Sequence, residues 1–179
     1  SVIQSASLWP GFNLDASGMS LWPQAAADAR KSGYQQILQF NSGLELIQVA
    51  NHVRQDAVAL NAMMSGASAV INTPFPGTGL GQQLQQVAQL IKLRASTGMS
   101  RQVFFCSLGG FDTHGSQSWQ HGDLLRQLSE ALAAFYTATG ELGVADKVTS
   151  FTLSDFGRTL QPSGTGTDHG WGSHHLVLG

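Results

Sequence analysis

Charge is scarce in this sequence of 179 residues. Asp, Glu, Lys and Arg together make up 11% of it, against about 25% in a typical soluble domain. The formal net charge is −2, and no stretch is basic enough to neutralise a run of phosphates, which excludes electrostatic binding of nucleic acid. Uncharged polar residues supply the polarity instead, and 42% of the residues are hydrophobic. The chain is therefore long and apolar enough for one domain with a core.

Cysteine and long apolar runs are nearly absent as well. The single cysteine, Cys106, has no partner for an internal disulfide, and its place inside an apolar run predicts a buried structural thiol. No apolar run reaches the ~20 residues that span a bilayer. The sequence starts without Met, a basic region or a signal-peptide core. We therefore expect a processed or excised chain, and these residues do not indicate its compartment.

Apolar periodicity predicts a single domain of the α/β class. The 3.6-residue period of a helix occurs at residues 42–65, 80–97 and 122–142. Short apolar runs typical of buried parallel strands lie at 103–108 and 148–153, and a further strand is expected from residue 175.

Strand, helix and strand in this order form a βαβ unit. We expect residues 79–179 to contain this unit and its loops, and residues 1–78 to be a mostly helical and loop region that covers one face of the sheet or caps the site.

The two loops that leave the carboxyl ends of the predicted strands are rich in Asp, His and Gly. The first carries Asp112 and His114, and the second carries Asp155, Asp168 and His169. Ligands of open parallel sheets bind beyond these strand ends, so we expect the five side chains to converge. Carboxylates and imidazoles together suit zinc, manganese or iron. The sequence therefore predicts a divalent-metal site at this edge of the sheet.

Further residues of these loops have more than one interpretation. Arg158 is the expected catalytic partner of a substrate's anionic oxygens, because its planar guanidinium matches them. His121, and either His174 or His175, could support the metal site or lie outside it, and Trp171 is expected to pack its loop. The alternative for each loop aspartate is a turn-forming or helix-capping role.

Two segments, VFFCSLGGFDTHG (103–115) and VTSFTLSDFGRTLQPSGTGTDHGWG (148–172), also carry a family resemblance. They resemble the signature segments of a bacterial family known as domain of unknown function 1501, most strongly over residues 80–179. That family is placed in the alkaline-phosphatase-like superfamily, which also holds sulfatases and cofactor-independent phosphoglycerate mutases. The resemblance implies a parallel sheet flanked by helices, a divalent-metal site, and hydrolysis or transfer of phosphate or sulfate esters. It further implies a periplasmic or extracellular location.

The resemblance assigns roles residue by residue. Asp112 and His114 resemble the Asp-x-His motif of the superfamily's first metal site, and His169, beside Asp168, resembles its later metal histidine.

Two departures limit what the resemblance implies. Asp155 stands where the superfamily has Asp-His, but Phe156 replaces that histidine, so a complete two-metal site is not implied. Family proteins are longer at both ends, and the first strand, which supplies the nucleophile, is absent here. We therefore expect an incomplete sheet and name no nucleophile, and whether the chain is active alone stays open.

The expected function is that of a metal-dependent hydrolase of phosphate or sulfate esters, acting on a small-molecule or polysaccharide anionic ester. The alternative is an exported, non-catalytic binding or structural protein with a degraded metal site. Calcineurin-like phosphoesterases also begin with Asp-x-His, but their later Gly-Asp-x-x-Asp and Gly-Asn-His-Asp/Glu segments do not occur in this sequence.

Overall fold

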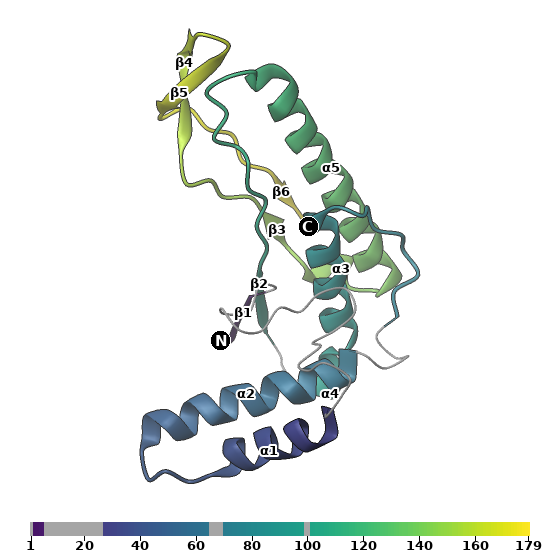
Figure 1. Cartoon of the computed structure of the whole chain (residues 1–179). Coiled ribbons are helices and arrows are strands. Elements are labelled where there is room, and N and C mark those ends of the chain that lie inside the picture. The colour runs from purple at the N-terminus through teal and green to yellow at the C-terminus, as the bar shows by residue number, and fades with distance from the viewer. Residues whose placement is uncertain (1, 6–26, 65–69, 99–100) are drawn as a thin grey trace.

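The computed structural model describes residues 2–5, 27–64, 70–98 and 101–179. It opens with β1 (Val2–Ser5) and continues with the helices α1 (Ala27–Gln39) and α2 (Glu45–Met64). The predicted helix over 42–65 is thus confirmed within these bounds, whereas α1 was not foreseen. In Figure 1 these two helices lie at one end of the molecule, and the β4–β5 strands lie at the other.

The apolar stripe that predicted α2 is exposed over the first half of the helix and partly buried over the second half. Leu46 and Val53 have exposed fractions of 81% and 61%. Periodicity therefore identified the helix, but this face is not part of the core among the described residues.

The core lies between α3 (Gly79–Lys92) and α5 (Gln117–Glu141). Its buried members are mostly aliphatic: Ile71, Leu80, Leu84, Val87, Ala88, Ile91, Ala131, Phe135, Ala138 and Val144. The Thr78 hydroxyl caps α3 by accepting a hydrogen bond from the Gly81 amide at 3.2 Å. The predicted helix over 80–97 is interrupted at Leu93, after which α4 (Arg94–Thr97) follows and ends at Gly98.

The strand β2 (Gln102–Phe105) packs one of its faces on this core. Phe104 and the partly buried Cys106 contact the cluster, while Val103 and Phe105 are exposed. Burial raises the pKa of the Cys106 thiol to about 11. The thiol is therefore protonated and unreactive at neutral pH, in keeping with the structural role that its position predicts.

Each described sheet has two strands. The strand β1 pairs in parallel with β2, and β3 (Ser150–Phe151) pairs antiparallel with β6 (Val177–Leu178). The predicted strand over 103–108 overlaps β2, the other two predicted segments contain β3 and β6, and the α/β class holds. Between α5 and β3 lies the short 3-10 helix η2 (Ala145–Lys147).

The expected extended parallel sheet is not found among the described strands, where parallel pairing is limited to β1 and β2. The helix α5 does connect β2 to β3, but these two strands do not pair with each other. The chain returns beside β3 as β6 and pairs with it in antiparallel direction.

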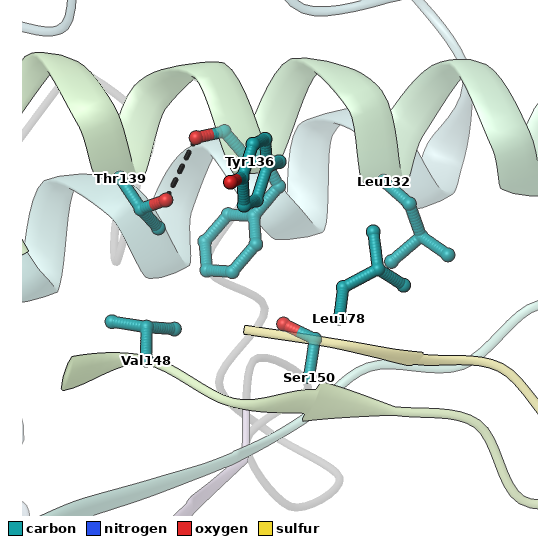
Figure 2. A pocket seen from close by; sticks show the side chains of 7 residues that line it. Leu132, Tyr136, Thr139, Val148, Ser150 and Leu178 are labelled. Carbon is teal, nitrogen blue, oxygen red and sulfur yellow. Dashed lines mark hydrogen bonds between the residues drawn. The ribbon is translucent and has the colours of Figure 1, made fainter. Parts of the chain in front are cut away.

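A small apolar pocket lies where α5 packs over the β3–β6 pair. Figure 2 shows Leu132 and Tyr136 on the helix facing Ser150 and Leu178 on the strands. Within the helix, the Thr139 hydroxyl donates to the Tyr136 carbonyl at 2.7 Å. The side chains that line this pocket offer no carboxylate or imidazole, so it belongs to the packing of the fold.

The segment after Phe156 was predicted as a loop, and that prediction is wrong. It forms an antiparallel hairpin of β4 (Gly157–Ser163) and β5 (Gly166–Gly170), with a positive φ of 61° at Gly164 in the turn and an irregularity between Arg158 and Pro162. Its many glycines and absence of apolar alternation hid the strands from the sequence analysis.

No helix in the described part of the chain is long and apolar enough to cross a membrane.

Candidate metal centre

Three potential metal ligands meet at the end of the molecule that carries the hairpin. Asp112 and His114 lie in the loop between β2 and α5, and His169 lies on β5. One carboxylate oxygen and two imidazole nitrogens, one atom from each residue, lie within 4.8 Å of one another. All three residues are exposed, so the site is open to solvent. The helices α1 and α2 lie at the far end of the molecule in Figure 1 and do not cap it.

The Asp112 carboxylate is the centre of the group. Its Oδ1 lies 2.7 Å from Nε2 of His169 and 2.8 Å from Nε2 of His114. The hydrogen bond from His169 and the neighbouring imidazoles lower the pKa of the Asp112 carboxyl below its ordinary value. The carboxylate is therefore ionised throughout the neutral range, as metal binding requires.

This donor set fits a divalent cation. A carboxylate and two Nε2 atoms form a mixed oxygen and nitrogen set of the kind that binds zinc, manganese or iron. The two imidazole rings lie 5.0 Å apart, with 29° between their planes, so both present a nitrogen to the same oxygen. Among the described residues this is the one group of three His, Cys, Asp or Glu side chains close enough to share an ion.

Asp168, a predicted ligand, lies on the outer side of His114. Its Oδ1 is 3.4 Å from Nδ1 of His114, the ring nitrogen opposite the one that faces Asp112. A carboxylate in this place orients a ligating imidazole and selects its tautomer. The geometry thus places Asp168 beside a ligand rather than inside the group of three.

Asp155 is not brought to the group. It is exposed, and it is not one of the three residues whose ligand atoms converge among the described side chains. Its neighbour Phe156 instead stacks face to face on the His169 ring, at 4.0 Å between centroids and 9° between planes. The sequence analysis missed this contact, and the only signal for it was that an aromatic residue replaced the expected histidine.

Arg158 is turned toward the loops that carry the ligands. Its guanidinium donates to the carbonyls of Phe111, at 2.6 Å, and Thr167, and to the hydroxyl of Thr113 at 3.3 Å. The Thr113 residue is only 2% exposed, so its hydroxyl is not presented to a substrate.

The hairpin is docked on the start of α5. The side chain and the carbonyl of Thr165 accept the backbone N–H groups of Ser116 at 2.8 Å and Gln117 at 3.1 Å. These are free donors at a helix N-terminus, and Thr165 supplies the cap that Ser116 does not. The sequence analysis missed Thr165 because its partners lie about fifty residues earlier in the chain.

The remaining predicted residues are not members of this group. The ring of His121 meets that of Phe111 edge-on at 5.5 Å, and its Nδ1 is buried with no hydrogen-bond partner in the described part of the chain. His175 faces Ser173 at 3.3 Å. Trp171, predicted to pack its loop, is instead 88% exposed; that prediction is wrong because the hairpin is held through its turn and Arg158.

The family model described as "Protein of unknown function (DUF1501)" matches residues 13–179. No curated protein and no solved structure matches the chain.

Proposed function

The chain belongs to the DUF1501 family, and from this premise we propose that it is a metal-dependent hydrolase of phosphate or sulfate esters whose cation is held by Asp112, His114 and His169. The observation that carries the proposal is the convergence of these three ligand atoms within 4.8 Å. Their exposure leaves room for an anionic ester to reach the centre.

Each side chain of the proposed site has a different role. When bound, a divalent cation would polarise a phosphoryl or sulfuryl oxygen and lower the pKa of a bound water. Asp112 supplies negative charge, and its lowered pKa keeps it available to the cation. Asp168, whose Oδ1 lies 3.4 Å from the far nitrogen of His114, is placed to orient that ring.

The proposal includes the alkaline-phosphatase-like fold that the sequence resemblance implies. The parallel pairing of β1 with β2 supports it, as do the exposed apolar side chains Val103 and Phe105 on the outer face of β2. Parallel strands with two apolar faces are typical of sheets covered by helices on both sides. A periplasmic or extracellular location, and a small-molecule or polysaccharide ester as substrate, rest on the resemblance alone.

A non-catalytic binding protein is the second candidate. Phe156 occupies the place of an expected ligand and stacks on His169. This observation favours a site that binds without turnover.

The test measures metal content and turnover together. The wild type is purified without chelator and compared with Asp112→Ala, His169→Ala and the control His52→Ala, which changes an exposed histidine on α2. We expect near-stoichiometric zinc, manganese or iron in the wild type and the control, and loss of the metal in the two site variants. Metal-dependent hydrolysis of p-nitrophenyl phosphate or sulfate would support the hydrolase. Metal without turnover would support the binding protein, and absence of metal would contradict the site.

A further inference from the structure

Arg158 connects the two chain segments that carry the candidate ligands. It lies on β4 directly opposite His169 in the register of the hairpin. One guanidinium nitrogen donates to Phe111 and Thr113, which flank Asp112, and the other donates to Thr167, two residues before His169. A single side chain therefore fixes the backbone on both sides of the metal group.

The acceptors of Arg158 suit an arginine in particular. Two are backbone carbonyls and one is a hydroxyl, and no ion pair between Arg158 and an acidic residue occurs among the described residues. A guanidinium is planar and always charged, and it offers five N–H donors in a fixed fork. Lysine has the charge but carries its donors on a single nitrogen and lacks the planar fork that directs separate nitrogens at two acceptors.

The same side chain also reaches His169 through an aromatic ring. The guanidinium carbon of Arg158 lies 5.2 Å from the centroid of Phe156, and Phe156 stacks on His169 at 4.0 Å. The ring of His169 therefore contacts two rings, that of Phe156 and that of His114, which is 5.0 Å away between centroids. Arg158 is therefore connected to the candidate ligand His169 through the ring of Phe156.

We propose that Arg158 is a positioning residue that preorganises the metal centre by locking the Asp112–His114 loop to β5. This inference rests on the proposed metal site. It differs from the sequence-based expectation that Arg158 binds the anionic oxygens of a substrate, because the donors are directed at the protein's own carbonyls. Preorganised ligand geometry lowers the cost of binding a cation.

The test compares the metal affinity of Arg158 variants with that of a matched arginine variant. Arg158→Lys and Arg158→Gln are set beside Arg126→Gln, which removes an exposed arginine paired with Asp123 and Glu130 on α5. Zinc dissociation constants are measured by competition with a chromogenic chelator, and cobalt(II) loading is followed by its visible absorption spectrum. We expect the zinc dissociation constant to rise about tenfold or more in both Arg158 variants, with an altered cobalt spectrum, and to stay within about twofold in Arg126→Gln.

A second variant keeps the inference testable if the Arg158 variants do not fold. Thr113→Val removes one acceptor of Arg158, together with the 3.4 Å hydrogen bond that the Thr113 hydroxyl donates to the Phe111 carbonyl. We expect it to raise the zinc dissociation constant by a smaller factor, about threefold. Circular dichroism checks the fold of each variant.

Two results would overturn the inference, and they are distinguishable. If folded Arg158 variants bind zinc as tightly as the wild type with the same cobalt spectrum, Arg158 does not position the ligands. A raised KM for p-nitrophenyl phosphate would then assign it to the substrate. If the wild type itself binds no metal, the proposed function fails and the inference fails with it.

Discussion

Asp155 and Asp168 are chemically identical, yet the structure gives them different surroundings. Asp168 lies 3.4 Å from His114, while Asp155 is exposed and outside the group. Because an outer carboxylate orients a ligating imidazole, we expect Asp168→Asn to weaken zinc binding about tenfold. Asp155→Asn is the matched control and should leave the dissociation constant unchanged. Calorimetric titration measures both, and the reverse order would favour Asp155 as a ligand, as the family resemblance implies.

Gly166 is required where the hairpin touches the loop that carries the ligands. A Cβ atom at this position would lie 2.4 Å from the carbonyl oxygen of His114 and 2.9 Å from that of Thr113. Both neighbours are backbone, so the contact is relieved only by moving the loop. We expect Gly166→Ala to lower the free energy of unfolding by about 1–3 kcal/mol and to weaken zinc binding.

Gly115 provides the control for this substitution. A Cβ there would meet the Thr165 hydroxyl at 3.7 Å, an ordinary contact. Urea denaturation of Gly115→Ala should give a free energy of unfolding close to that of the wild type. Equal stabilities of the two variants would contradict the tight approach of the hairpin.

At the scale of elements, one carboxylate fastens the end of α5 to the segment before α3. Glu141 accepts the backbone N–H groups of Asn72 at 2.9 Å and Thr73 at 2.8 Å, together with their side-chain donors. These hydrogen bonds, the one from the Asn72 backbone first, lower the pKa of the Glu141 carboxyl below its ordinary value of 4.5. Lys92 adds a favourable charge.

The sign of this shift predicts a pH dependence. Because the carboxyl is more acidic in the folded state than in the unfolded state, its stabilising contribution is fully present above pH 4.5 and is lost as the pH falls through the folded value. We expect Glu141→Gln to unfold at a lower temperature than the wild type at neutral pH, and the difference to shrink as the pH falls below 4.5. Melting curves at several pH values measure this, and a pH-independent difference would contradict it.

The elements differed in how well the sequence predicted them. The helices α2, α3 and α5 have a regular apolar period, and each was predicted to within a few residues at most ends. The hairpin β4–β5 was not predicted, since its strands are polar and rich in glycine. It is held by a hydrogen bond that Thr165 accepts from the Ser116 amide and by one that Arg158 donates to the Phe111 carbonyl. Such contacts join distant segments and leave no local pattern.

At the scale of the whole molecule, the sequence predicted that the segments of Asp112 and His169 meet, but it gave a different structural reason for this. Asp112 and His169 were expected to meet because parallel strands end at one edge of a sheet. In the structure they meet because the hairpin folds back onto the start of α5 and places β5 beside the loop after β2. Asp155, which precedes the hairpin, is left outside the group.

A cation that bridges the two segments should stabilise the entire fold. The ligands come from the loop after β2 and from β5, 55 residues apart between His114 and His169, so only the folded chain presents them together. Binding to the folded state alone stabilises by about 2.7 kcal/mol at a free metal concentration of one hundred times the dissociation constant. For a chain of this length that corresponds to a rise in Tm of about 5–10 °C.

We therefore expect the Tm to increase with zinc concentration and to return to its starting value with a chelator. His114→Ala should abolish the increase and His52→Ala, on the distant helix α2, should keep it. An increase that persists in His114→Ala would place the stabilising cation elsewhere on the chain. The absence of any increase in the wild type would mean that the three side chains form a hydrogen-bonded group only, in which Asp112 holds His114 and His169 in place of a metal.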